Sequence, residues 1–367
     1  MFNLYSQLDI SGYSQLRYNR LFETNPNLSC EQCDRSWGSP GGFFLRRVRL
    51  KFQADLSNKV FIYLQPDFAS GGFNLGQLRD AYVDISLDSN RVWRFRAGQS
   101  KVPFGFENMQ SSQNRLPLDR NDGLNSGLSN ERDIGVFFYW TPERITKLHE
   151  SLIEEGLKGS GNYGSFAFGV YNGQLANNLK SNDKIHLVSR FSYPFKIKGN
   201  IWETGIQAYK GYYTISKENV STGVIHRSDL TYLDQRVAIS SILYPKPLGL
   251  QFEWNWGTGP EFNKDNNSIE NKRLSGGYIL INYKIENNNM LFYPFGRYHY
   301  YSGGKKHEKD ARSYDVSEFE IGLEIQPNKN LELVLMYVFS NRRYEDYILN
   351  DNLQQGRLLR LQLQVNF

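Results

Sequence analysis

Arginine and lysine recur at every second position in two segments of this 367-residue chain. In an extended strand such positions share one face. The residues concerned are Arg47, Arg49 and Lys51, then Arg94 and Arg96. A ladder of these cations attracts anions and donates forked hydrogen bonds to phosphate or carboxylate groups. The alternative is that the cations pair across strands with carboxylates, which the sequence offers at Asp55, Asp67, Asp80 and Asp84.

Spacings typical of catalysis, metal binding or nucleotide binding do not occur. The five histidines are scattered and include no His-Glu-x-x-His pair. The run Gly303-Gly304-Lys305-Lys306 has neither the upstream glycine nor the following Ser or Thr of a phosphate-binding loop. Nothing local combines a nucleophile, a histidine and an orienting group. We therefore expect no enzymatic activity, no cofactor and no metal.

The two cysteines, Cys30 and Cys33, are separated by two residues. This spacing suits a short disulfide loop, a redox pair or half of a zinc site. No second pair or nearby histidine completes a zinc site, and the βαβ setting of a thioredoxin-like motif is missing. We expect Cys30 and Cys33 to form an inert disulfide or thiol pair in a surface loop.

The composition favours strands over helices. Aromatic residues make up 15% of the chain, yet its mean hydropathy is −0.57. The longest apolar runs, at 135–140 and 333–339, are far shorter than the ~20 residues of a membrane-spanning helix. The net charge of +5 is mild and basic residues form no runs, so we expect no nucleic-acid partner. Residues 1–4 show no signal-peptide start, so an exported protein is expected here in its mature form.

Alternation of polar and apolar side chains predicts the fold class. Leu250, Phe252 and Trp254 share one face of a strand, and Gln251 and Glu253 share the other. Such runs are about ten residues long, which matches a tilted strand crossing a bilayer better than a strand of a soluble sandwich. Aromatics near the ends of the apolar face are typical of the girdles of outer-membrane barrels. The sequence predicts one all-β domain over residues 1–367, a transmembrane antiparallel barrel whose apolar faces point outward.

Sixteen strands are expected, an even number as single-chain bacterial barrels require. Their centres lie near residues 14, 49, 64, 82, 95, 136, 168, 189, 207, 237, 253, 279, 296, 321, 335 and 361. Short turns at 56–59, 87–90, 245–247 and 326–330 alternate with long connections at 19–42, 101–130, 257–272, 302–314 and 341–355. Because periplasmic turns are short and outer loops long, both termini should lie on the periplasmic side.

Two connections are unusual. Segment 141–160 falls where a short turn is expected, and Pro142 at a first helical position predicts a brief helix there. Segment 101–130 is too long for an ordinary connection, so we expect it to fold into the lumen as a constriction. It would then bring both signs of charge to the pore, from Lys101, Glu107, Arg115, Asp119, Arg120 and Asp122. The alternative is an ordinary surface loop.

Short motifs resemble, in their order, the phosphate-selective porin O and P family of outer-membrane barrels. They are 11–18 (SGYSQLRY), 44–50 (FLRRVRL), 64–69 (LQPDFA), 80–84 (DAYVD), 98–105 (GQSKVPFG), 131–136 (ERDIGV) and 170–173 (VYNG). The resemblance implies a sixteen-stranded, commonly trimeric barrel in the bacterial outer membrane that passes anions. It adds Arg132, in the sixth motif, to the residues expected to line the pore.

The later strands depart from what a strongly phosphate-selective pore needs. Their expected lumen faces carry Glu253, Glu318, Glu320, Glu324 and Glu332, and the basic column is confined to the early strands. We therefore expect a porin for passive diffusion of small solutes, with a modest preference for anions such as phosphate. The alternative is a barrel with a plugged lumen that serves as a structural or docking subunit of a surface complex. We expect the protein to contact outer-membrane lipid and small anionic solutes, and to assemble as a homotrimer.

Overall fold

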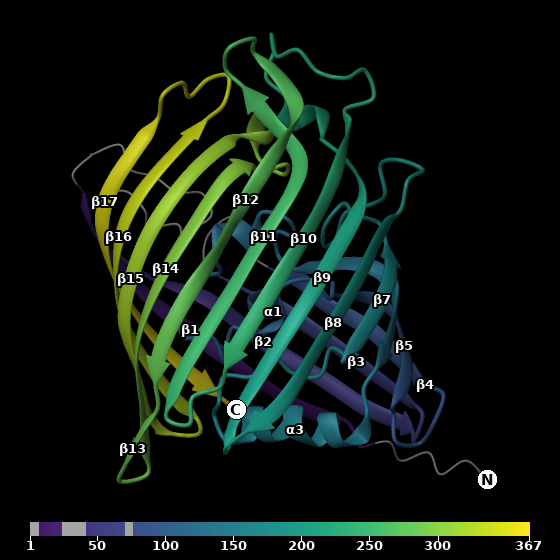
Figure 1. The fold of residues 1–367 in the computed structure, drawn as a ribbon, viewed down its shortest axis with the longest axis vertical. Coiled ribbons are helices and arrows are strands. Elements are labelled where there is room, and N and C mark those ends of the chain that lie inside the picture. Colours follow the sequence, from purple (N-terminus) through teal and green to yellow (C-terminus); the bar gives the residue numbers. More distant parts are fainter. Residues whose placement is uncertain (1–6, 24–41, 70–75) are drawn as a thin grey trace.

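A computed structural model describes residues 7–23, 42–69 and 76–367 of the chain (Figure 1). These residues form one closed ring of antiparallel strands, in which β1 pairs with both β2 and β17. The wall strands are β1 (Asp9–Glu23), β2 (Gly42–Ser57), β3 (Val60–Phe68), β4 (Gln77–Ser86), β5 (Trp93–Lys101), β6 (Arg132–Trp140), β7 (Phe166–Tyr171), β8 (His186–Ile197), β9 (Asn200–Thr214), β10 (Thr231–Leu243), β11 (Leu248–Asn263), β12 (Ser268–Tyr283), β14 (Met290–Gly304), β15 (Ser313–Asn328), β16 (Leu331–Glu345) and β17 (Leu353–Asn366). A further short strand, β13 (Ile285–Asn287), continues β12 beside β14.

The sixteen-stranded antiparallel barrel that the sequence predicts is confirmed, and each expected centre falls inside a strand. The alternating faces are also as expected. Leu361 is 39% exposed on the outside of the ring, whereas its neighbour Arg360 is 2% exposed and Glu253 is fully buried. A soluble sandwich would bury the apolar set instead, because one step of register exchanges the two faces of a strand.

Several strands extend further than the sequence predicts. Residues 257–272 were expected to form a long connection, but β11 runs to Asn263 and β12 begins at Ser268. Connections 302–314 and 341–355 are shortened in the same way. The reason is that the strand hydrogen bonds continue to the pair Asn263 and Ser268, although polar and apolar residues no longer alternate regularly there, so the alternation ends before the ladder does.

One end of the ring carries the short turns. We call this the short-turn end, and the opposite end the long-loop end. The start of β1 pairs with the end of β17, Tyr13 facing Asn366, so both strands meet at the short-turn end. Helix α3 (Glu143–Glu154) lies across the same end (Figure 1).

Helix α3 packs its apolar side into the barrel. Its buried residues include Leu152, which belongs to one apolar cluster with Phe106, Ile201 and Tyr244. Pro142 is the residue before the helix, with φ −55° and ψ 141°, and not its first helical residue as the sequence predicts. Such non-helical dihedrals are typical of the residue that precedes a helix.

Two further helices are short, α1 (Phe106–Met109) and α2 (Asp122–Asn125). No helix among the described residues is long and apolar enough to cross a membrane.

Candidate functional site in the barrel lumen

The connection between β5 and β6, residues 102–131, contacts the inward faces of strands from several parts of the ring. We call it the 102–131 loop; it contains α1 and α2. Glu107 accepts from Arg297 on β14 at 2.5 Å, and Asp119 accepts from Arg360 on β17. The backbone oxygen of Gly123 accepts from Asn255 on β11 at 2.9 Å. One loop therefore joins strands that lie far apart in the sequence.

Apolar packing fixes the same loop against one side of the wall. Phe104 and Leu124 of the loop belong to a buried cluster with Phe137, Tyr171 and Tyr209 on β6, β7 and β9. The ring of Phe104 meets that of Tyr209 edge to face at 4.9 Å. This packing holds the loop against β6, β7 and β9.

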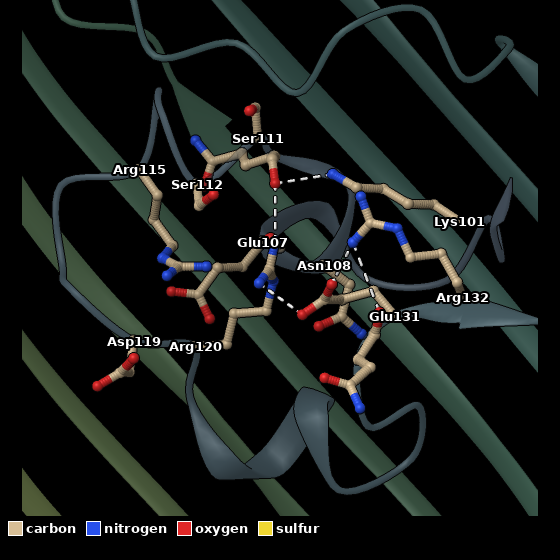
Figure 2. Close-up of polar contacts among 12 residues, drawn as sticks. Lys101, Glu107, Asn108, Ser111, Ser112, Arg115, Asp119, Arg120, Glu131 and Arg132 are labelled. Atoms are coloured by element: carbon tan, nitrogen blue, oxygen red, sulfur yellow. Dashed lines mark hydrogen bonds and ion pairs between the residues drawn. The ribbon is translucent and has the colours of Figure 1, made fainter. Parts of the chain in front are cut away.

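Glu131, at the end of the loop, is surrounded by arginines. Its carboxylate lies 2.5 Å from both Arg120 and Arg132 (Figure 2). It also lies 3.1 Å from Arg79. Burial by itself raises the pKa of the Glu131 carboxyl, but these arginines, Arg120 foremost, hold that pKa well below its usual range. Glu131 is therefore a permanent anion that neutralises part of the basic wall.

Asp119 and Asp122, which belong to the same loop, are also surrounded by cationic side chains. Asp122 accepts from Lys305 at 2.8 Å and lies 2.9 Å from Arg342. Burial opposes ionisation of both aspartates, but the arginines and lysine around them keep each pKa well below its usual range. Each loop carboxylate thus binds the wall as an anion.

Glu253 holds the loop in a different way. Its two carboxylate oxygens accept the backbone N–H groups of Phe106 at 2.5 Å and Glu107 at 2.8 Å. These groups open α1 and would otherwise lack partners inside the helix. Glu253 therefore positions the loop.

The other glutamates on the later strands are also engaged. Glu318 pairs with Arg342 at 2.8 Å and Glu320 with Arg297 at 2.6 Å. Glu324 pairs with Lys158, and Glu332 accepts from Gln364 at 3.4 Å. Each of the five predicted lumen glutamates therefore has a hydrogen-bonding partner among the described residues.

The predicted basic residues divide into three groups, of which the first forms ion pairs between strands. Arg49 lies 2.7 Å from Asp67, Arg96 binds Asp84 through two hydrogen bonds of 2.7 and 2.8 Å, and Arg132 lies 2.9 Å from Asp80. Arg94 is 3.9 Å from the same Asp84 and donates to the backbone oxygen of Asn162. Asp55 pairs elsewhere, with Arg91 in a turn.

The second group binds the 102–131 loop. Lys51 donates to the Gln113 side chain at 2.5 Å, and Lys101 donates to the backbone oxygens of Met109 and Gln110. Arg120 donates to the backbone oxygens of Glu107 and Gln110. These cations anchor the loop, a role that their positions in the sequence do not reveal.

Arg47 and Arg115, like Lys51 and Lys101, form no ion pair with a described residue, and each of the two arginines also has a buried guanidinium nitrogen without a described partner. Arg47 donates to Gln15 Oε1 at 2.9 Å, and its Nε has no partner among the described residues. Arg115 donates to the backbone oxygens of Pro117 and Leu118, and its Nη1 likewise has no described partner. Both are at most 5% exposed.

Both arginines line one cavity of about 470 Å³ on the long-loop side of the loop, which we call the vestibule. Its wall comes from β2 to β4, the loop and β14 to β17, and it contains nine arginines against seven carboxylates. A buried guanidinium N–H without a partner is a donor ready for a ligand oxygen. The vestibule is therefore suited to anions.

The later strands also contribute cations to the pore. Arg297 and Arg342, which face inward on β14 and β16, were not predicted to line it, whereas Arg360 on β17 faces inward as its alternation with Leu361 predicts. All three line the vestibule. The prediction that basic residues are confined to the early strands is therefore wrong. Arg342 could have been predicted by continuing the alternation beyond the segments in which it is clear. The pattern is hidden there because Arg343 follows Arg342, so that arginine occupies both faces of the strand.

Asp122, His299 and Glu318 bring three metal-ligating atoms within 4.8 Å of one another. Arg342 already lies within 2.9 Å of both carboxylates, and Lys305 binds Asp122. The carboxylates are thus neutralised by fixed cations, and a metal ion would have to displace these cations.

Cys30 and Cys33, predicted to form a disulfide or thiol pair, lie outside the described residues.

A second polar cavity, of about 870 Å³, opens at the short-turn end between α3 and the wall; we call it the lower cavity. Glu155, Lys158 and Glu332 are among its lining residues. The lumen thus holds polar space on both sides of the 102–131 loop.

Comparisons with known proteins agree with this geometry. The family model described as phosphate-selective porin O and P matches residues 30–367. The outer membrane channel DcaP of Acinetobacter baumannii shares the fold over 100% of this chain and 98% of its own, at 14% identity and a TM-score of 0.62. The Salmonella typhi OmpF complex with daunomycin does so over 100% and 99%, at 12% identity and a TM-score of 0.59.

An anion-selective porin from Comamonas acidovorans covers 99% of this chain and 100% of its own, at 11% identity and a TM-score of 0.57. At such identities the likeness to solved structures concerns the fold alone. No curated protein matches the chain in sequence.

Proposed function

The chain belongs to the phosphate-selective porin O and P family of the bacterial outer membrane, and on this premise we propose that it is a channel for passive diffusion with a modest preference for small anions. The observation that carries the preference is the pair Arg47 and Arg115. Both guanidiniums are buried, form no described ion pair and line the vestibule. The short-turn end is then periplasmic, since periplasmic turns are short.

The 102–131 loop is, in this proposal, the constriction. It crosses between vestibule and lower cavity, and its carboxylates cancel much of the basic wall. A lumen whose cations are mostly paired should discriminate weakly between anions and cations. This is why we propose a modest preference and not a dedicated phosphate channel.

Reversal potentials in a salt gradient test the preference. Arg47→Ala and Arg115→Ala should each lower the anion-to-cation permeability ratio while leaving the channel open. Arg343→Ala is the matched control, because Arg343 adjoins Arg342 but is exposed on the outer face of β16. Cation preference in the unmodified protein would refute the proposal.

A second candidate function is a docking or structural subunit with a plugged lumen. The favouring observation is that the loop binds the wall through ion pairs and apolar packing at once. Absence of conductance in planar bilayers would favour this candidate.

We also propose that the barrel assembles as a homotrimer. An apolar hollow of about 820 Å³ lies on the outer wall, lined by Pro294 and Gly296 on β14 together with Ile321 on β15 and Leu335 on β16. A solved structure titled as the trimer form of OmpT from Vibrio cholerae shares the fold, at 9% identity and a TM-score of 0.55. The mass of the purified protein in detergent, compared with Gly296→Trp, tests this assembly.

A further inference from the structure

An apolar stretch separates the vestibule from the lower cavity along the inward face of β16. Glu332 lines the lower cavity, and Val338 lines the vestibule. Val334 and Met336, the two inward residues between them, line neither cavity and are at most 3% exposed. Six residues of strand separate Glu332 from Val338, which is about 20 Å at the usual rise.

The loop covers this stretch with its own apolar residues. Leu116 and Leu118 are 2% and 3% exposed and belong to one buried cluster with Val334 and Met336. On the loop, Asn114 lines the lower cavity, whereas Arg115 and Asp119, on either side of the two leucines, line the vestibule. The leucines therefore pack against Val334 and Met336, where the wall lines neither polar space.

We propose that Leu116 and Leu118 form an apolar barrier between the vestibule and the lower cavity, and that conduction requires their segment to leave the wall. The inference rests on the proposed channel function. An apolar constriction excludes water, and an ion cannot enter it without losing its hydration. The arrangement in which the leucines meet Val334 and Met336 is then the closed one.

Four wall arginines hold the segment closed. The Asp119 carboxylate binds Arg360 and lies 3.4 Å from Arg17 and 3.7 Å from Arg46. Arg17 also donates to the backbone oxygen of Leu118 at 3.2 Å, and Arg297 donates to that of Asp119 at 3.0 Å. The strongest of these contacts are charge-assisted hydrogen bonds.

The vestibule gives a solute access to the same arginines. Arg46, Arg360 and Asp119 all line it. An anion in the vestibule therefore competes with Asp119 for two of the guanidiniums that hold the loop. Occupancy by an anion should loosen the segment and open the barrier.

Single-channel recording tests the barrier. The double variant Leu116→Asn with Leu118→Asn should raise the time-averaged conductance about threefold or more, because polar side chains hydrate the layer. Leu128→Asn is the matched control: Leu128 is buried in the same loop but packs in the cluster of Phe104 and Tyr209. The wall-side double variant Val334→Asn with Met336→Asn removes the same layer if the loop variant does not fold.

Inorganic phosphate tests the competition with Asp119. At constant ionic strength, phosphate replacing chloride should raise the open probability of the unmodified protein. Asp119→Asn should be open more often without phosphate and should lose the response.

The outcomes separate the two proposals. Equal conductance in the unmodified protein and in both double variants would refute the barrier and leave the channel function standing. No conductance in any of these proteins would refute the channel function and the barrier with it.

Discussion

Arg297 on β14 joins the 102–131 loop to the wall through Glu107: Arg297 Nη1 lies 2.5 Å from Glu107 Oε1, and neither side chain is more than 1% exposed. The same guanidinium binds Glu320 at 2.6 and 3.0 Å. One cation therefore neutralises a loop carboxylate and a wall carboxylate. The position of the loop against the wall depends on this arginine.

Removing Arg297 should destabilise the protein strongly. Arg297→Ala leaves Glu107 and Glu320 buried without this cation, and breaking a buried ion pair costs about 3–5 kcal/mol. We expect the free energy of unfolding in urea, measured in lipid vesicles, to fall by that amount. The control is Lys147→Ala, which breaks the exposed pair with Glu143 on α3 and should leave the free energy of unfolding nearly unchanged, because solvent screens such a pair. Equal effects of the two changes would contradict this account.

The contribution of Glu131 to stability should depend on pH in a defined direction. Its pKa is lower in the folded protein than the ordinary 4.5, so the folded state binds fewer protons than the unfolded chain. The stabilisation is fully present above about pH 4.5 and is lost as the pH falls towards the lowered pKa. The difference in unfolding free energy between the unmodified protein and Glu131→Gln should be equal at pH 7 and pH 6, and smaller at pH 3. A difference that shrinks between pH 7 and pH 6 would show that Glu131 is not held as an anion.

Asp67→Asn should increase the preference for anions. Asp67 lies 2.7 Å from Arg49 and 3.9 Å from Arg79, and all three line the vestibule. Without the carboxylate, two guanidiniums face the solute, and we expect the anion-to-cation permeability ratio to rise roughly twofold. Asp315→Asn, on the outer face of β15, should leave the ratio unchanged. Reversal potentials measure both, and an unchanged ratio in Asp67→Asn would show that the vestibule does not control selectivity.

The bilayer explains why the strands were predictable. A wall strand must place apolar side chains towards lipid at every second position, so Leu361 and Arg360 reveal their faces from the sequence alone. The same rule fails at the long-loop end, where the alternation becomes irregular while β11 and β12 continue past the expected turn.

The ion-pair network was not predictable in the same way. A lumen carboxylate can meet any cation that the ring and the loop bring near it, and Asp119 and Arg360 are 241 residues apart. Local spacing found Arg49 and Asp67 as possible partners because they lie on adjacent strands. It gave no sign that Glu253 accepts from the backbone of α1 or that Lys101 binds Met109.

The contacts of Asp119 have a consequence for biogenesis. They reach β1 and β17, the first and the last strand of the ring, which are also the strands whose pairing closes it. Contacts at such sequence separation form late, because a long stretch of chain must be ordered before they are gained. Loop seating and ring closure should therefore be one cooperative step. A chain that ends before β17 would leave the Asp119 carboxylate with Arg17 and Arg46 as its cations among the described residues. An unfinished barrel is therefore also one in which the loop is less firmly held.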